Sequence, residues 1–219
     1  MLGTLLTSLF GGRRARITTL GGLAEFMAAR TAFVSQKVTL DYCRARAALH
    51  WQKLLGEEPF LRALEYCRWE AYAAVLGDVA EVVQIYLRRA GAPEPPLPEV
   101  VGDLARAALL RHPVPSHRES WDEVVDAIRA RLQRANLAAP RPVHLVGTVS
   151  APRVFEVLPI HGSVRRHDRE VVTNSLRFLL VRVYGDLEQQ VDGPAVVAAI
   201  AEGAEATETG SAARPIAGP

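Results

Sequence analysis

The densest group of side chains that could do chemistry lies in the last third of the chain. His161 precedes Arg165, Arg166, His167 and Arg169, so five basic residues fall within nine positions. Arg166 and Arg169 stand three positions apart and would be neighbours on a helix. Guanidinium groups bind phosphate and carboxylate through paired, charge-assisted hydrogen bonds, and the start of a helix favours the same anions. The sequence therefore predicts an anion-binding site at Arg165, Arg166, His167 and Arg169.

Three kinds of protein would use such a cluster. A helical enzyme would hold a phosphorylated substrate with residues 161–169, and an RNA- or DNA-binding module would hold the nucleic-acid backbone there. In a purely structural role the arginines would pair with acidic residues of the fold. No aromatic residues alternate with these arginines and no nucleic-acid-binding motif accompanies them, which disfavours nucleic acid as a partner. We expect ion pairs from this cluster and Arg153 to the acidic residues of the second long helical stretch, namely Glu57, Glu58, Glu65 and Glu70.

No motif in the chain specifies a catalytic residue, a metal site or a cofactor. His167 and Asp168 are adjacent, and with His144 and Asp192 they could supply ligands for a divalent cation. The pair alone is a weak signal, because an Asp in the first turn of a helix also complements the helix dipole. The two cysteines are 24 positions apart and neither has a neighbouring ligand at the spacing of a zinc site, and no Glu-x-x-His pair is present to form a di-iron site. The sequence therefore predicts no catalytic residue, no metal and no cofactor.

The chain has two cysteines, Cys43 and Cys67. They fall on the two arms of an expected helical hairpin, about 6 Å out of register along the helix axes. This offset disfavours a disulfide, so we expect two buried thiols and a reducing compartment.

A second candidate contact surface lies in the first residues of the chain. Four apolar side chains on one face of a short helix are followed by three arginines, an arrangement that suits an anionic membrane surface. The alternative is packing of this segment onto the hairpin or at a subunit interface. Because the charges follow a short apolar run, the pattern is neither a secretory signal nor a membrane span. We therefore expect a cytoplasmic protein, which would be peripheral to the inner membrane face if this segment binds the membrane surface. The residues concerned are Leu5, Leu6, Leu9, Phe10, Arg13, Arg14 and Arg16.

Two long helical stretches must position these side chains. Residues 22–55 and 60–90 contain no proline, and Pro59 opens the second stretch while Gly91 and Pro93 close it. Proline in the first helical turn and glycine after the last one are typical of helix ends. The short connection forces the two stretches into an antiparallel hairpin.

Shorter elements follow the hairpin. We expect helices near 99–111, 121–135, 164–191 and 193–201, while β-prone residues at 143–158 predict an extended crossover. The fold class is therefore mainly α, a long antiparallel helical hairpin packed with three or more shorter helices and at most a minor β element. The expected divisions are an N-terminal segment (1–18), the hairpin (19–91), a helical remainder of the same domain (92–203, with the crossover at 140–163) and a disordered tail (204–219).

A long hairpin without a catalytic motif is typical of proteins that hold other proteins. We therefore expect a non-enzymatic interaction protein, such as an adaptor, an assembly factor or an oligomeric scaffold. Its partner would be another protein, and self-association into a homo-oligomer fits the same shape.

Overall fold

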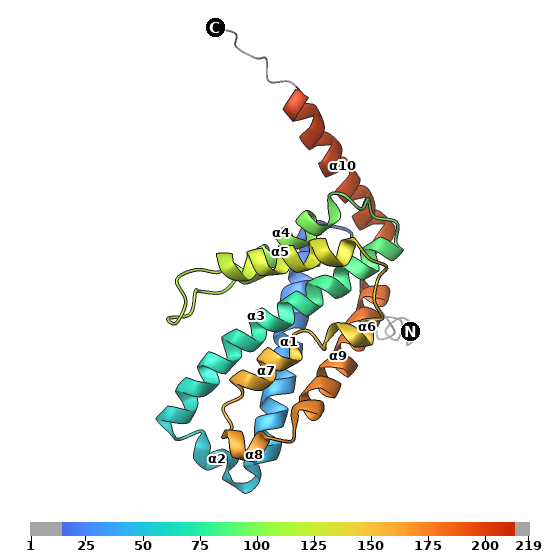
Figure 1. Cartoon of the computed structure of the whole chain (residues 1–219). Helices are drawn as coiled ribbons and strands as arrows, with labels where there is room; N and C mark the ends of the chain where they lie inside the picture. The colour runs from blue at the N-terminus through green and yellow to red at the C-terminus, as the bar shows by residue number, and fades with distance from the viewer. Residues whose placement is uncertain (1–14, 213–219) are drawn as a thin grey trace, which may run out of the picture.

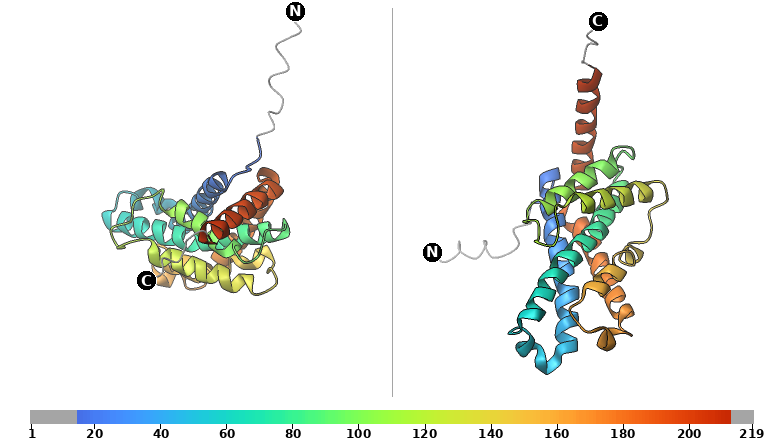
Figure 2. Two further views of the ribbon diagram at one scale, coloured as in Figure 1. Left: turned by 90° about the horizontal axis from the view of Figure 1, so that it is seen from above. Right: turned by 60° about the vertical axis from the view of Figure 1, so that its left-hand side comes forward.

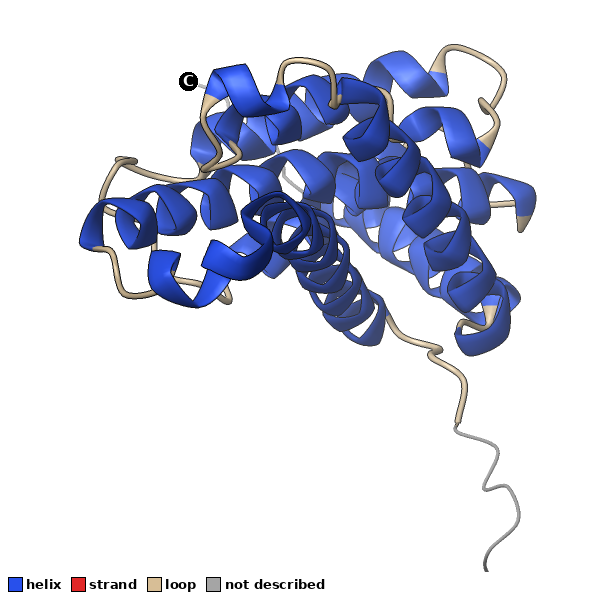
Figure 3. Cartoon of the chain, turned by 90° about the horizontal axis from the view of Figure 1, so that it is seen from below, coloured by secondary structure: helices blue, strands red, loops and turns tan. Residues whose placement is uncertain are grey.

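The computed structural model describes residues 15–212, and the side chains of residues 15–203. The described residues form a bundle of helices without a β-sheet (Figure 3), which confirms the mainly α fold class. The elements in chain order are α1 (Leu20–Ala47), the 3-10 turn η1 (Ala48–His50), α2 (Trp51–Leu54), α3 (Glu58–Arg89), α4 (Leu97–Leu109), α5 (Asp122–Asn136), α6 (Val143–Val146), α7 (Ala151–Val157), α8 (Gly162–Arg165), α9 (Arg169–Gln190) and α10 (Gly193–Ala212).

The helical hairpin is formed by α1 and α3, which run in opposite directions and cross each other (Figure 1). Its first arm is shorter than predicted. Ala48 has a φ of 45°, in the left-handed region, so α1 ends at Ala47 and the chain continues as a 3-10 turn and the short α2. The second arm agrees with the prediction, since Pro59 lies in the first turn of α3 and Gly91, with a φ of 89°, follows its end.

Helix α3 is the central element of the bundle. Helices α4 and α5 cover its C-terminal half on one side, while α6, α7 and α9 pack on the other (Figures 1 and 2). Between Trp69 and Leu87 every residue except Ala74 is buried. The apolar residues from Cys67 through Val79 to Tyr86 form one buried face of α3, and α3 is buried on its other faces too.

The segment at 143–158 is helical, and the predicted extended crossover is wrong there. Its valines form the buried sides of α6 and α7, so packing against α3 and α9 overrides their preference for strands. Gly147 permits this packing, because a Cβ at that position would lie 3.2 Å from backbone atoms of Leu176 and Arg177.

Two further boundaries differ from the prediction. The helix expected at 164–191 is divided into α8 and α9, because Asp168 turns inward between them. Helix α10 extends away from the other helices and continues to Ala212, so the disordered tail predicted from residue 204 is wrong over 204–212 (Figures 1 and 2). The predictions for residues 1–14 and 213–219 lie outside the described residues.

Within residues 15–212, one parallel β-bridge joins Ile17, just before α1, to Val191, just after α9. Ile17 donates to the carbonyl of Gln190 at 2.7 Å, and Asp192 donates to the carbonyl of Ile17 at 2.9 Å. Arg16 adds a hydrogen bond of 2.6 Å to the carbonyl of Glu188. None of the described helices is both long enough and apolar enough to cross a bilayer.

Candidate functional site

The predicted anion-binding residues are placed around α8 with different environments. Arg165 turns back to α7, where it donates to the carbonyls of Phe155 and Glu156, the latter at 3.0 Å. Arg169 lies over the ring of Phe155, with 5.9 Å between its guanidinium carbon and the ring centre. Arg166 and His167 are exposed. Arg165 is thus occupied by the fold, and anion binding at the other three residues stays a prediction.

Asp168, the neighbour of His167, is buried and belongs to a contact between α1 and α9. The hydroxyl of Tyr42 donates to Asp168 at 2.7 Å, and Arg46 forms an ion pair with the same carboxylate. The hydrogen bond from Tyr42 lowers the pKa of Asp168, and burial raises the pKa of Tyr42 to about 12. Asp192 lies at the opposite end of α9, about 33 Å away along the helix, so the structure does not bring these two potential metal ligands together.

A groove lies between α1 and α9, which pack antiparallel to each other. The pair of Arg46 and Asp168 crosses the two helices at one end, and an ion pair of 3.2 Å between Arg30 and Asp186 crosses them at the other. At 1.5 Å per helical residue, these crossings stand about 24 Å apart along α1.

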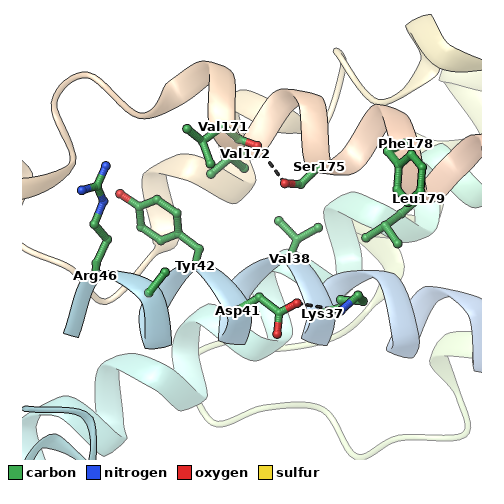
Figure 4. Close-up of a pocket in the computed structure, with 11 residues that line it drawn as sticks. Lys37, Val38, Asp41, Tyr42, Arg46, Val171, Val172, Ser175, Phe178 and Leu179 are labelled. Atoms are coloured by element: carbon green, nitrogen blue, oxygen red, sulfur yellow. Dashed lines mark hydrogen bonds and ion pairs between the residues drawn. The ribbon is translucent and has the colours of Figure 1, made fainter. Parts of the chain in front are cut away.

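The groove contains a cavity of about 350 Å³ next to the Arg46–Asp168 end (Figure 4). Its floor is apolar, since Val38 and Tyr42 of α1 point toward Val172 of α9 and these three side chains are buried. The lining residues are Lys37, Val38, Asp41, Tyr42, Ala45 and Arg46 from α1, and Val171, Val172, Ser175, Phe178 and Leu179 from α9.

The α9 wall of the groove exposes large apolar side chains. Val171 is 53% exposed, Phe178 is 64% exposed and Val181 is 47% exposed. Val171 and Phe178 are seven positions apart, so both lie on the groove side of the helix. Val171 and Phe178 therefore add exposed apolar surface to the rim of the cavity, whereas Val181 lies outside its lining.

The polar groups of the groove are satisfied within the chain. The hydroxyl of Ser175 donates to the carbonyl of Val171 at 2.8 Å, and Lys37 forms an ion pair of 2.7 Å with Asp41 (Figure 4). By contrast, Arg182 of α9 is exposed, lies one helical turn beyond Phe178, and forms no ion pair with a described carboxylate. The groove therefore has an apolar interior, and Arg182 leaves one positive charge beside it without a carboxylate partner.

A separate group of polar side chains is buried along α3, and the sequence did not single it out as a group. Glu70 is 3% exposed and accepts two hydrogen bonds of 2.8 Å from Arg118 and one of 2.6 Å from Arg153. The Nε2 atom of His117 lies 3.0 Å from Oε1 of Glu70. These charged donors lower the pKa of Glu70 despite its burial. The pair with Arg153 confirms one of the ion pairs expected between the basic cluster and the second arm.

Farther along α3, Asp78 and Glu81 share Arg131 of α5. Its Nη1 lies 2.8 Å from Asp78, and its Nε donates to Glu81 at 2.8 Å. Burial raises the pKa of Asp78 to about 6, although Arg131 and the hydroxyl of Ser150 favour the charged form. Among the described residues, no group of histidine, cysteine, aspartate and glutamate side chains is arranged to hold a metal ion.

Both cysteines are buried and free, as expected, and burial raises the pKa of each thiol to about 12. They are therefore packing residues and not reactive nucleophiles.

Comparisons of this chain with protein-family models, with curated proteins and with solved structures found no match.

Proposed function

We propose that this protein is a non-enzymatic interaction protein that binds an amphipathic α-helix of a partner protein in the groove between α1 and α9. The exposed side chain of Phe178 beside an apolar cavity is the observation that carries this proposal. Large side chains that become fully desolvated in a pocket at the centre of an interface supply much of its binding energy.

The dimensions of the groove support a helical partner. The two ion pairs that cross α1 and α9 leave a length of about 24 Å, which corresponds to about four turns of an α-helix. Apolar side chains at three- and four-residue spacing on such a helix would contact Phe178 and Val171 on α9 and the floor at Val38.

The charge beside the groove supports an acidic partner. Arg182 of α9 has no carboxylate partner among the described residues, whereas the lining pair of Lys37 and Asp41 is already neutral. An acidic residue beside the apolar face of the bound helix would pair with Arg182 and fix the position of the helix.

A binding titration tests the proposal. The probe is a fluorescent peptide of about 16 residues, with leucines at helical spacing and glutamates at the other positions. We expect saturable binding of the peptide to the wild type. Its dissociation constant for Phe178→Asp should be higher by about tenfold or more, because a charge would enter the apolar contact. The matched control is Leu137→Asp, which changes an 89%-exposed leucine away from the groove and should bind like the wild type.

Two further measurements, one with a scrambled peptide and one by sedimentation, can each contradict the proposal. A peptide of the same composition with scrambled leucines should not bind, and equal binding of both peptides would mean that charge alone causes the association. Sedimentation of the unliganded protein distinguishes the other occupant: a dimer that Phe178→Asp dissociates would assign the groove to a second copy of this chain.

A further inference from the structure

A second cavity lies on the other side of the bundle, between α3, α5 and the segment that follows α5. It has a volume of about 360 Å³, and we refer to it as the arginine pocket. Arg88 comes from α3, Arg131 and Arg134 come from α5, and Arg141 comes from the following segment. The only acidic side chain in its lining is Glu81, so four guanidinium groups face one carboxylate.

Buried carboxylates hold two of these arginines in fixed orientations. Arg131 uses Nε for Glu81 and Nη1 for Asp78, and Arg141 places its Nε 2.8 Å from the second oxygen of Glu81. Gly77 leaves room for Arg131 to cross α3, since a Cβ there would lie 3.1 Å from its Nη1. The guanidinium groups are therefore positioned before any ligand arrives, which lowers the entropy cost of binding.

The same arrangement leaves hydrogen-bond donors unused. The Nη2 of Arg131 is buried and has no partner among the described residues. Arg134 lines the pocket, and no described residue pairs with its side chain. An unpaired buried donor is costly, and an oxyanion that accepts from two guanidinium groups would remove this cost.

The overall charge of the pocket also favours an anion. Arg88 is satisfied by the carbonyls of Ala135 and Ala138 and by an ion pair of 3.0 Å with Glu94, so it compensates the negative end of α5. Arg131 and Arg141 share the charges of Asp78 and Glu81. The charge of Arg134 remains unbalanced.

The rest of the lining indicates a ligand larger than an inorganic ion. Ile85, Ala135, Pro140 and Val149 form an apolar part, and the volume is in the range of sites for small organic molecules. Gln84 is 1% exposed, and its Oε1 is an acceptor without a partner. A hydroxyl or amino group of a ligand could donate to this oxygen.

We propose that the arginine pocket binds the oxyanion group of a small organic molecule, either a phosphate ester or a carboxylate. This site is independent of the groove between α1 and α9. It also differs from the anion-binding site predicted at Arg165, Arg166, His167 and Arg169.

Thermal unfolding with three probe anions tests this site: inorganic phosphate, glycerol 3-phosphate and citrate, each against chloride at the same ionic strength. We expect a saturable rise in the melting temperature with at least one anion, because a ligand that binds only the folded state stabilises it. A preference for glycerol 3-phosphate would indicate a phosphate ester, and a preference for citrate a carboxylate.

Two matched variants locate the binding. Arg134→Gln removes the unpaired charge without breaking a contact, and it should weaken the apparent affinity for the stabilising anion by about tenfold or more. Arg166→Gln removes an exposed arginine of the sequence-predicted cluster and should leave the affinity unchanged. The proposal is overturned if no anion stabilises the protein beyond chloride, if Arg134→Gln binds like the wild type, or if Arg166→Gln loses the affinity instead.

Discussion

Glu70, Asp78 and Glu81 lie in the part of α3 from Trp69 to Leu87, which is buried and otherwise largely apolar. Each is paired with arginines that follow α3 in the chain, from Arg118 to Arg153. A buried carboxylate is tolerated only when charged donors replace its water, so these pairs fix where α5, α7 and the connection before α5 meet α3.

The cost of losing Glu70 measures how strongly this pairing holds the fold. Replacing Glu70 with Ala should lower the free energy of unfolding by about 3 kcal/mol, because two arginines lose their buried partner. Glu156→Ala is the matched control, since Glu156 pairs with the same Arg153 but is 67% exposed, and it should cost less than about 1 kcal/mol. Urea denaturation of both variants checks this. Equal losses would show that the buried pairing contributes nothing beyond a surface ion pair.

Asp78 should make stability depend on pH in a defined direction. Burial raises its pKa in the folded protein from 3.8 to about 6, so its contribution to stability is complete below pH 3.8 and is lost as the pH rises through about 6. The free energy of unfolding of Asp78→Asn should therefore lack this loss between pH 4 and 6.5. Ser150→Ala should extend the loss to higher pH, because the hydroxyl of Ser150 stabilises the charged form. If the free energy of unfolding depended on pH in the same way in all three proteins, a raised pKa of Asp78 would be contradicted.

The sequence contained most of the information for the long elements and little for the short ones. The helix predicted near 164–191 is present as α9 over most of its length, and its apolar residues at helical spacing are buried, namely Val172, Leu176, Leu179, Leu180, Val183 and Leu187. Helices α6 and α7 were missed because their valines favour strands locally, whereas the tertiary contacts with α3 and α9 decide their conformation. Pro152 in the first turn of α7 was a helix-start signal that could have been used.

Two glycines test how closely the elements pack. Gly147→Ala should destabilise the protein by about 1–3 kcal/mol, because the added Cβ would meet the backbone of α9 at 3.2 Å. Gly185 lies inside α9 with nothing within 4 Å of a Cβ, so Gly185→Ala should stabilise the protein by about 1 kcal/mol. Thermal unfolding of the two variants should give shifts of opposite sign. Shifts of the same sign would contradict the close approach of α6 to α9.

At the scale of the whole molecule, the central helix separates two surfaces. The arginine pocket lies on the side of α5, and the groove lies between α1 and α9. Neither was predicted from the sequence, because each combines residues from distant segments. The sequence signal available for the groove was Val171, Phe178 and Val181, three apolar residues that lie outside the buried face of α9.

Binding of a partner helix in the groove between α1 and α9 is tested most directly by a map of amide chemical shifts from NMR. When the glutamate-rich peptide of the binding titration is added, we expect shifts concentrated at residues 37–46 of α1 and 171–182 of α9. The amides of α5, on the other side of α3, should stay unchanged. Saturating shifts at α5, or an absence of shifts at both walls of the groove, would contradict binding of a partner helix between α1 and α9.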